Sequence, residues 1–513
     1  MTHWLPEGLP GVLPPDLRSL DAAQAALAAW RENDRRLDAL LRQDIPVTIA
    51  LDRHAGHLWQ EKRVEDSAAL LKIAVALAPE QPWLWSNLGA AFNAVGQNEL
   101  ARACVDYSLR LAPHQPRVWL FLATLCATIG DDAAAESAFL TALEQAPELA
   151  DGWFGLAQLR HRQRRFEDAA LCLDSCIACG GGDATIYGLL GQIRYQIGAF
   201  SAAADAFSAA VALAPEQSHY RHMLGLVRTL TVAIAGGDAT QASTAYRTAA
   251  GTAAMALKLV FRTAFGLLNG FGHQEAALRL GRAYLELDPD NPSTHYMLAA
   301  VTGTDLTRSP DDYLVEHFNG FADSFDSQLV TMLGYRVPEA LCVLVEAVLT
   351  ADDRKLEVVD AGCGTGLAGP LIRARANTLT GLDLAPRMIE KAAARGVYDH
   401  LVETEVTTWL ARHPASTDLI LAADLLVYIG DVRGLFAAAA IALKPDGLLA
   451  LSIETITGRD YQLLSCGRFA QDPEYIARTA ADHRLIVVRT QTIDLRLEAN
   501  HPVAGRLFLL RRI

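Results

Sequence analysis

Apolar residues recur every three or four positions through the N-terminal half of the chain, whereas the last third holds short runs of leucine, isoleucine and valine bounded by glycine, proline or aspartate. The first pattern is typical of amphipathic helices and the second of buried strands. In the helical part, Pro79, Pro113, Pro147 and Pro215 follow one another at intervals of 34, 34 and 68 residues. Because proline cannot continue a helix, each marks the end of a unit. The pattern predicts repeated helix pairs followed by a domain with buried strands.

Other positions keep this 34-residue register. An aromatic residue in each unit and a small residue on its second helix are what two antiparallel helices need in order to pack on each other and on the next pair. This is the period and pattern of the tetratricopeptide repeat, so we expect a superhelix with a concave face. The aromatic positions are Trp85, Trp119, Trp153 and Tyr187, the small positions are Ala101, Ala135, Ala169 and Ala203, and Gly181 stands where the missing proline would fall.

The register also predicts where the repeats begin and where they are interrupted. Residues 48–81 form a degenerate first unit, and a helical cap surrounds Leu20 to Leu41. Pro215 and Pro289 are 74 residues apart, which is two repeats plus six, so an irregular unit rich in alanine and threonine is expected between them. The predicted domains are a helical N-terminal cap at 1–47, tetratricopeptide repeats at 48–226, an irregular helical region with a further repeat and a capping helix at 227–305, and a C-terminal domain at 306–513.

A glycine-rich turn follows the first strand of the C-terminal domain. Val358 to Asp360 is a strand pattern, and Gly362, Gly364 and Gly366 precede a helical pattern that begins at Leu367. Glycine admits a positive φ and lets a ligand lie against bare backbone, while the first turn of a helix offers unpaired N–H groups. The segment predicts a nucleoside-binding turn.

A second strand, from Thr378 to Asp383, ends in a carboxylate 17 residues after Gly366. In nucleotide-binding βαβ units a carboxylate at this place binds the ribose diol. The segment from Asp360 to Gly366 resembles the first motif of class I S-adenosylmethionine-dependent methyltransferases, and Asp383 resembles the acidic end of their second strand. Dinucleotide dehydrogenases usually have the spacing G-x-G-x-x-G, whereas one residue separates Gly364 from Gly366, so the methyltransferase resemblance is preferred.

Later segments resemble the same family over roughly the last 190 residues, the size of one α/β domain. The resemblance implies an α + α/β protein in which an all-α tetratricopeptide superhelix precedes a Rossmann-like, doubly wound class I methyltransferase domain at residues 306–513, as in similar bacterial proteins that join the two. The expected later strands are Leu401 to Val406, Asp418 to Asp424, Leu443 to Ser452, with Asp446 in place of a usual glycine, and an antiparallel pair from Leu485 to Thr490 and from Arg506 to Leu510.

The resemblance implies S-adenosyl-L-methionine as the cofactor. Tyr335 and Arg336 could reach its methionine carboxylate, because arginine offers paired donors; alternatively, the phenylalanines at 318–325 mark the apolar face of a lid packed on the sheet. Glu405 aligns with an acidic residue near the adenine amino group, and otherwise it is a solvated strand end. The implied cofactor-binding residues are Tyr335, Arg336, Asp360, Gly362, Gly364, Gly366, Asp383, Leu384, Glu405, Val406 and Ala423.

Asp424 and Tyr428 follow the fourth expected strand, and ligands of parallel sheets bind at the carboxyl ends of the strands. We therefore expect these two residues near the methyl acceptor, as candidate catalytic residues. Methyl transfer from a sulfonium is an in-line displacement, so alignment can supply most of the catalysis. If the acceptor is a hydroxyl or an ammonium, Asp424, Tyr428, Glu454 or His317 could remove its proton. The histidines form no H-x-x-x-H pair and the carboxylates no ligand-like cluster, so no metal is expected.

The sequence narrows the acceptor class only in part. The Asn/Asp-Pro-Pro-Tyr signature of amino-methyltransferases and the paired-glutamate loop of arginine methyltransferases are both absent. The leading hypothesis is an enzyme that methylates a protein or a carrier-bound group, with a protein or peptide partner recruited on the repeat surface. The alternatives are a small-molecule methyltransferase whose repeats form a homo-oligomer, and a non-catalytic scaffold.

Three cysteines have the C-x3-C-x2-C spacing that binds an iron–sulfur cluster in radical enzymes. They fall on the second helix of a repeat, whereas a cluster would need a loop that presents all three sulfurs outward. We expect thiols that pack as small apolar residues. The cysteines are Cys172, Cys176 and Cys179, and Cys176 takes the position of Ser108, Ala142 and Ala210 in other units.

Composition bears on the partners and the compartment. The formal net charge of −14 argues against a nucleic-acid surface, which would need a basic patch. No apolar run reaches the roughly 18 residues of a membrane helix, and the first residues lack the pattern of a signal peptide. Eight cysteines scattered over 513 residues fit reduced thiols. We expect a cytoplasmic protein that binds neither nucleic acid nor membrane.

Overall fold

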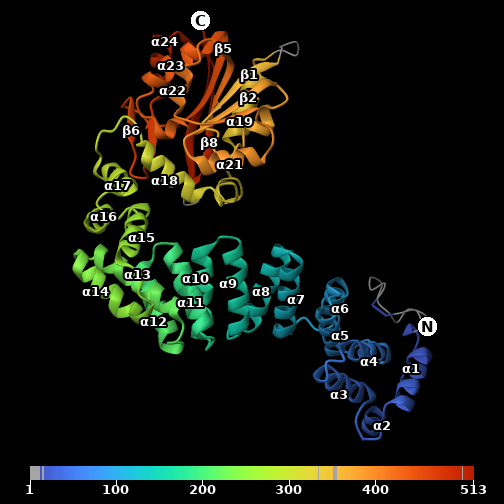
Figure 1. Cartoon of the computed structure of the whole chain (residues 1–513). Coiled ribbons are helices and arrows are strands. Elements are labelled where there is room, and N and C mark those ends of the chain that lie inside the picture. The colour runs from blue at the N-terminus through green and yellow to red at the C-terminus, as the bar shows by residue number, and fades with distance from the viewer. Residues whose placement is uncertain (1–11, 14–16, 333, 350–354, 499–500) are drawn as a thin grey trace. The chain divides into compact units, whose positions relative to one another are not determined.

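A computed structural model of the chain describes residues 12–13, 17–332, 334–349, 355–498 and 501–513. Parts of the predicted cap, at 1–11 and 14–16, and Leu333 lie outside the described residues. The chain forms two compact units (Figure 1): the first comprises Met1–Arg228 with Tyr246–Ala254, and the second comprises Thr229–Ala245 with Met255–Ile513. The domain boundaries given above stay predictions.

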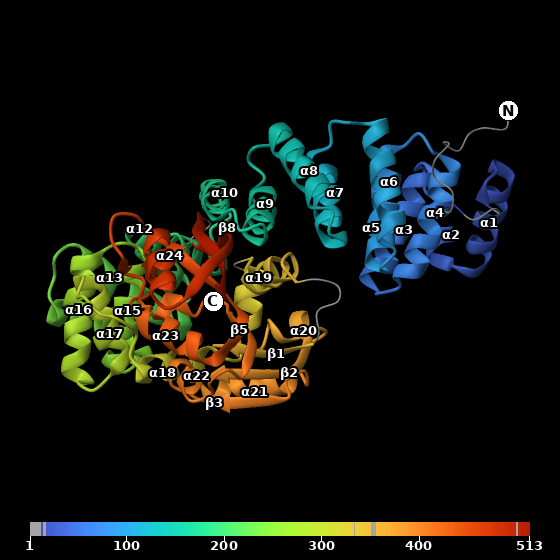
Figure 2. The ribbon, with the colours of Figure 1, turned by 90° about the horizontal axis from the view of Figure 1, so that it is seen from above.

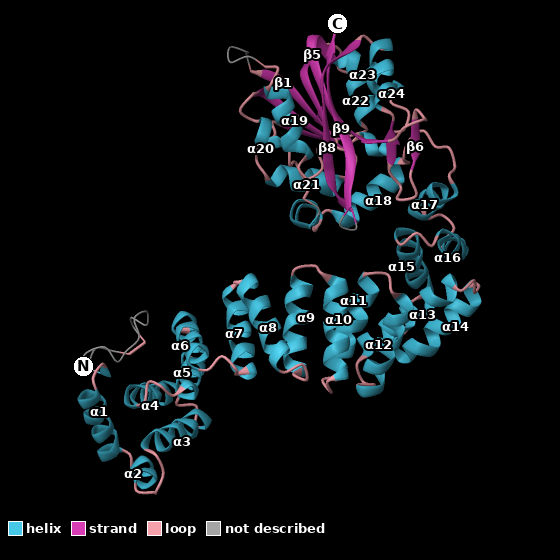
Figure 3. Cartoon of the chain, turned by 180° about the vertical axis from the view of Figure 1, so that it is seen from behind, coloured by secondary structure: helices cyan, strands magenta, loops and turns pink. Residues whose placement is uncertain are grey.

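The N-terminal unit is a row of paired helices, as the 34-residue register predicts (Figure 3). The expected cap is helical, and the degenerate first unit is the pair α3 and α4. The helices are α1 (Leu20–Asn33), α2 (Arg35–Leu41), α3 (Val47–Gln60), α4 (Val64–Leu77), α5 (Pro82–Ala94), α6 (Asn98–Leu111), α7 (Pro116–Ile129), α8 (Asp132–Gln145), α9 (Ala150–Arg162), α10 (Phe166–Ala178), α11 (Ala184–Gln196) and α12 (Phe200–Leu213). The next two helices, α13 (Ser218–Ile234) and α14 (Ala239–Ala250), each contribute residues to both units.

One hydrogen bond explains why tryptophan and proline repeat together. The indole N–H of Trp85 donates to the carbonyl of Pro79 at 2.7 Å, and the same bond recurs in each of the next two units. It fixes the turn between one helix pair and the next. The small positions on the second helices are fully buried, which confirms their packing role. The recurring bonds are Trp119 to Pro113 at 2.9 Å and Trp153 to Pro147 at 2.8 Å, and the small residues are Ala101, Ala135, Ala169 and Ala203.

The expected irregular unit is present where the register breaks. Helix α13 is 17 residues long, against 13 or 14 for the helices of the regular repeats, and a short 3-10 turn (Gly251–Ala253) follows α14. The predicted last repeat is the pair α15 (Leu257–Gly270) and α16 (Gln274–Leu287), and the predicted capping helix is α17 (Pro292–Thr302). These three helices belong to the C-terminal unit.

The C-terminal unit contains a nine-stranded mixed sheet of order β3-β2-β1-β4-β5-β7-β6, in which β9 pairs antiparallel with β5 and β8 pairs with β9. Strands β1 to β5 are parallel. The strands are β1 (Leu356–Ala361), β2 (Ala376–Asp383), β3 (His400–Glu403), β4 (Thr417–Ala422), β5 (Leu443–Thr455), β6 (Tyr461–Leu463), β7 (Phe469–Gln471), β8 (Leu485–Glu498) and β9 (His501–Arg512).

Helices cover both faces of this sheet, so the fold is doubly wound (Figure 2). Alternate residues of a strand enter opposite cores: Val358 packs under α19 and α20, whereas Val359 packs under α22, α23 and α24. The helices are α18 (Asp311–Phe321), α19 (Val337–Glu346), α20 (Gly369–Ile372), α21 (Pro386–Ala394), α22 (Val406–Ala411), α23 (Arg433–Ala442) and α24 (Pro473–Asp482), with a π-helix at Ser327–Met332 and a 3-10 helix η4 at Leu426–Tyr428.

Several expected boundaries were wrong. The helix after the glycine loop begins at Gly369 rather than Leu367 and makes a single turn, because β2 already starts at Ala376. The third strand ends at Glu403, since Glu405 caps the next helix. The last two strands are longer than expected, and the hairpin of β6 and β7 was not expected at all. In the part of the chain that the structure describes, no helix is long and apolar enough to cross a membrane.

Candidate functional site

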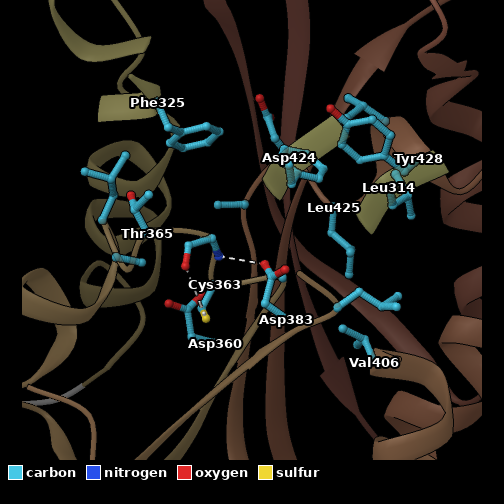
Figure 4. A pocket seen from close by; sticks show the side chains of 18 of the residues that line it. Leu314, Phe325, Asp360, Cys363, Thr365, Asp383, Val406, Asp424, Leu425 and Tyr428 are labelled. Carbon is cyan, nitrogen blue, oxygen red and sulfur yellow. Dashed lines mark hydrogen bonds between the residues drawn. The ribbon is translucent and has the colours of Figure 1, made fainter. Parts of the chain in front are cut away.

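A cavity of about 370 Å³ opens beyond the carboxyl ends of β1, β2 and β4 (Figure 4). It brings together most of the residues that the sequence singled out, although their roles stay predictions. Arg336 is exposed and Gly366 packs against Tyr398, and neither lines the cavity. The predicted residues that line it are Tyr335, Asp360, Gly362, Gly364, Asp383, Leu384, Glu405, Val406, Ala423, Asp424 and Tyr428, with His317 of the candidate bases.

The glycine loop and the acid after β2 form one hydrogen-bonded unit. Gly364 has a φ of 54°, and its N–H donates to Oδ2 of Asp383 at 2.9 Å. The other carboxylate oxygen accepts the N–H of Ala385 at 2.8 Å. Burial raises the pKa of Asp383, against the lowering effect of these backbone donors. A carboxylate has about four lone-pair sites, so Asp383 can still accept from a diol in the cavity.

Asp360, near the end of β1, helps to hold the glycine loop in place. It is 2% exposed, and its Oδ2 accepts the hydroxyl of Tyr398 at 2.6 Å. Burial raises the pKa of Asp360 to about 6. Tyr398 also fills the space that side chains at Gly366, Gly369 and Gly381 would need: a Cβ at Gly369 would lie 2.7 Å from its ring. The Asp360–Tyr398 pair therefore fixes the glycine loop against the sheet.

Glu405 forms a helix cap rather than a strand end. Its two carboxylate oxygens accept the N–H groups of Thr407 and Thr408 at 3.0 and 2.7 Å. Burial raises the pKa of Glu405, but these donors outweigh it, so the pKa lies below its usual value. Arg308 lies 3.7 Å away, across the cavity rim. Glu405 is thus held as a charged group at the edge of the cavity.

An aromatic segment covers one side of the cavity. Three phenylalanines of α18 and the following turn line it, as the lid interpretation predicts, and the ring of Phe325 lies 3.9 Å from the Cβ position of Gly364. The segment is tied to α21 because Asp323 pairs with Arg387 at 2.6 Å and with Lys391 at 2.9 Å. The lining phenylalanines are Phe318, Phe321 and Phe325.

Asp424 marks the other end of the cavity. It follows β4 with a φ of 51°, in the left-handed region, where non-glycine residues are uncommon and often functional. Its N–H donates to the hydroxyl of Ser452 at 2.8 Å, and that hydroxyl donates back to Oδ1 at 2.8 Å. Arg496 donates to Oδ2 at 3.4 Å. Burial raises the pKa of Asp424, which makes it a better proton acceptor near neutral pH.

Two arginines that the sequence analysis did not single out stand behind Asp424. Arg496 of β8 and Arg468 of the turn before β7 both donate to Oε1 of Glu454, the latter at 2.9 Å, and both line the cavity. Glu454 is therefore held by two guanidinium groups, which makes it a poor candidate for a base. In the sequence, Arg496 could have been noticed as a charged residue between two leucines in the last strands. No sequence pattern marks Arg468.

Tyr428 and His317 face the cavity from η4 and α18. The Tyr428 ring meets Phe318 edge to face, with 5.4 Å between ring centroids, and His317 stacks on Tyr313 at 5.5 Å. Burial raises the pKa of Tyr428 and lowers the pKa of His317. Both groups are therefore neutral at pH 7, so Tyr428 can donate a hydrogen bond and His317 can accept a proton.

Cys172 and Cys176 lie on α10 in the N-terminal unit, and Cys179 is the residue that caps the end of this helix. Cys172 and Cys176 are each 1% exposed, and Cys176 packs at the fully buried position of its counterparts, which confirms the expected packing. Arg160 donates to the sulfur of Cys172 at 3.2 Å, and the thiol of Cys179 donates to Pro147 at 3.4 Å. The sulfurs thus have separate partners.

Both parts of the chain match known families. Residues 359–449 match the methyltransferase domain family, and residues 87–150, 130–184 and 154–218 match the tetratricopeptide repeat family. The ubiquinone biosynthesis O-methyltransferase of Xanthomonas campestris pv. campestris (strain B100) is 31% identical over 126 residues, which are 24% of this chain and 50% of that protein. The chain thus spans about half the length of the curated relatives it matches.

Two solved structures each resemble a part of the chain. A SAM-dependent methyltransferase from Methanosarcina mazei is 15% identical with a TM-score of 0.29, and the match covers 33% of this chain and 97% of that one. The C-terminal part of a TPR repeat-containing protein from Cytophaga hutchinsonii is 14% identical with a TM-score of 0.34, over 47% and 97%. The two family matches thus place tetratricopeptide repeats within residues 87–218 and a methyltransferase domain at residues 359–449.

Proposed function

We propose that the chain transfers a methyl group from S-adenosylmethionine to a protein or carrier-bound acceptor that the repeats recruit. The observation that carries the proposal is the position of Asp383, which is bonded to the glycine loop and lines the same cavity as Asp424. One end of the cavity therefore offers a carboxylate and bare backbone for a nucleoside. The other end offers a buried carboxylate for an acceptor.

The residues of the cavity fit this cofactor. Asp383 would accept from the ribose hydroxyls, and the backbone at Gly362 and Gly364 would lie against the nucleoside. S-adenosylmethionine, when bound, supplies a methyl group on a positively charged sulfur. The aromatic rings of Phe325 and Tyr428 line the cavity and favour a cation.

The chain's own groups account for the remaining chemistry. The aromatic segment of α18 excludes water, and rigid loops at the strand ends align the acceptor for displacement. Asp424 would accept the acceptor's proton on its carboxylate, which Ser452 and Arg496 hold in place. The curated relatives are named O-methyltransferases of ubiquinone biosynthesis, so a hydroxyl is the first acceptor chemistry to test.

Recruitment by the repeats is supported by the family match at residues 87–218. Helix-pair repeats stack into extended surfaces that bind partners, and a second binding surface on the same chain raises the effective concentration of an acceptor at the cavity.

The test is transfer of a tritiated methyl group from S-adenosylmethionine into a dialysed lysate and, separately, into its small-molecule filtrate. Label in macromolecules supports the proposal, and label confined to the filtrate favours a small acceptor. Removal of residues 1–217 should leave S-adenosylhomocysteine binding intact and greatly reduce macromolecular labelling. Unchanged labelling would assign the repeats another task, such as self-association. No binding and no labelling by the full chain would point to a scaffold.

A further inference from the structure

Tyr296 of α17 anchors the turn between β6 and β7. It is 2% exposed, and its hydroxyl donates to the carbonyl of Gly467 at 2.9 Å. A second anchor comes from α15, where the side-chain amide of Asn269 donates to the carbonyl of Ser465 at 2.6 Å. Figure 1 shows α17 close to β6 and α18. The apolar residues packed around these bonds are Tyr296, Ala300, Tyr313, Leu463 and Phe469.

The anchored turn supplies Arg468 to the cavity. Arg468 donates to Glu454 at 2.9 Å, and Glu454 also accepts from Arg496. Arg496 in turn donates to the carboxylate of Asp424 at 3.4 Å. A continuous series of charged hydrogen bonds therefore leads from the turn held by α17 to the carboxylate at the acceptor end.

The same tyrosine hydroxyl holds a second loop. It lies 2.7 Å from the hydroxyl of Ser309, which must be the donor because the tyrosine proton is directed at Gly467. The N–H of Ser309 donates to the carbonyl of Tyr428 at 2.9 Å, and Gly430 donates to Thr307 at 2.9 Å. The segment around Ser309 is thus paired with the loop that carries Tyr428 into the cavity.

We propose that Tyr296 is a positioning residue for methyl transfer, and that α15 and α17, the helices that anchor the β6–β7 turn, are a structural part of the acceptor side of the site. The inference rests on the proposed methyl transfer. One buried hydroxyl joins the two loops that contribute Arg468 and Tyr428, so its loss removes an anchor from both loops. Small misplacements at a site that works by alignment lower the rate of transfer more than the binding of cofactor.

The test compares Tyr296→Phe with Tyr284→Phe in the full chain. Tyr284 of α16 is also 2% exposed and its hydroxyl also makes a hydrogen bond, to Asp288 at 2.8 Å, away from the cavity. For Tyr296→Phe we expect faster amide exchange in β6–β7 and η4. We also expect about a tenfold fall in tritiated-methyl transfer into dialysed lysate at saturating cofactor. The apparent KM for S-adenosylmethionine should stay the same. Tyr284→Phe should change none of these.

A double-mutant cycle with Arg468→Met separates positioning from general destabilisation. If Tyr296 acts through the turn that carries Arg468, Tyr296→Phe costs less transfer in the Arg468→Met background than in the wild type. Additive losses, a Tyr296→Phe rate equal to that of Tyr284→Phe, or an equal loss of cofactor binding and transfer would each overturn the inference. A wild-type chain that neither binds S-adenosylhomocysteine nor labels any acceptor would instead overturn the proposed function on which it rests.

Discussion

The carboxylate of Asp383 accepts the backbone N–H of Gly364 at 2.9 Å, which ties the acidic end of β2 to the loop after β1. With its second bond to Ala385, the side chain has one fixed orientation at the wall of the cavity. A ribose that binds there meets a preorganised acceptor, and no side-chain ordering is needed on binding.

Replacement of Asp383 tests this arrangement. Asp383→Ala removes the acceptors of the ribose hydroxyls and should weaken S-adenosylhomocysteine binding by about 1.5–3 kcal/mol, because these bonds involve a charged group. Asp383→Asn keeps one acceptor oxygen and should fall between alanine and wild type. Calorimetric titration measures the affinity of both variants. The control is Asp446→Asn, which lies near the amino end of β5 and does not line the cavity. Equal affinities for wild type and Asp383→Ala would rule out the ribose contact.

The repeats could be predicted from the sequence because the contacts that define them are local and recur in each unit. Each unit has a proline after one helix and a tryptophan six residues later that donates a hydrogen bond to it, as Trp85 does to Pro79. Such a short spacing can be recognised in the sequence of any unit. The parallel strands were likewise evident because both faces of the sheet are buried, so Val358 and Val359 are both apolar.

The parts that could not be predicted depend on contacts between distant segments. Glu405 stands where the resembling family has an acidic residue, and it also caps a helix. The cap became evident only from the hydrogen bonds that the N–H groups of Thr407 and Thr408 donate to its carboxylate. Arg468 lies on a short hairpin with no strand period, and its place in the cavity follows from anchors on α15 and α17. Arg468 therefore gives no signal in the sequence pattern.

Asp360 should make the stability of the C-terminal unit depend on pH. Its folded pKa of about 6 lies above the usual value of 3.8, so the carboxyl stabilises the fold when protonated. This contribution is present below about pH 4 and is lost as the pH rises through 6, amounting to about 3 kcal/mol. Asp360→Asn cannot ionise, so its free energy of unfolding should fall less between pH 4 and 7 than that of the wild type. Urea unfolding at several pH values measures the difference, and parallel curves would contradict the prediction.

Asp424 should set the acid limb of the transfer rate. Burial raises the pKa of Asp424, and the charge of Glu454 raises it further. Arg496, Ser452 and Arg468 lower the pKa, but they do not outweigh the burial. A base must be deprotonated, so transfer should fall as the pH drops through this raised pKa. Asp424→Asn should lose about 10²–10⁴-fold in rate with cofactor affinity kept. Arg468→Met should move the acid limb to higher pH, since it removes a lowering charge. A pH profile identical in Asp424→Asn and wild type would exclude Asp424 as the base.

The ion pairs between the turn after α18 and α21 should control how fast the cofactor leaves. Asp323 binds Arg387 and Lys391, and it holds the phenylalanines of the lid over the glycine loop. Asp323→Ala should speed dissociation of S-adenosylhomocysteine roughly twofold to fivefold, because exposed ion pairs are weak. Asp460→Ala removes a similarly exposed pair, with Arg478, outside the lid, and should have no effect. Stopped-flow fluorescence measures both rates. Salt should speed dissociation more from the wild type than from Asp323→Ala, which keeps the pair of Asp326 with Arg395 in this segment. An equal response in both proteins would mean that the pairs of Asp323 do not hold the lid.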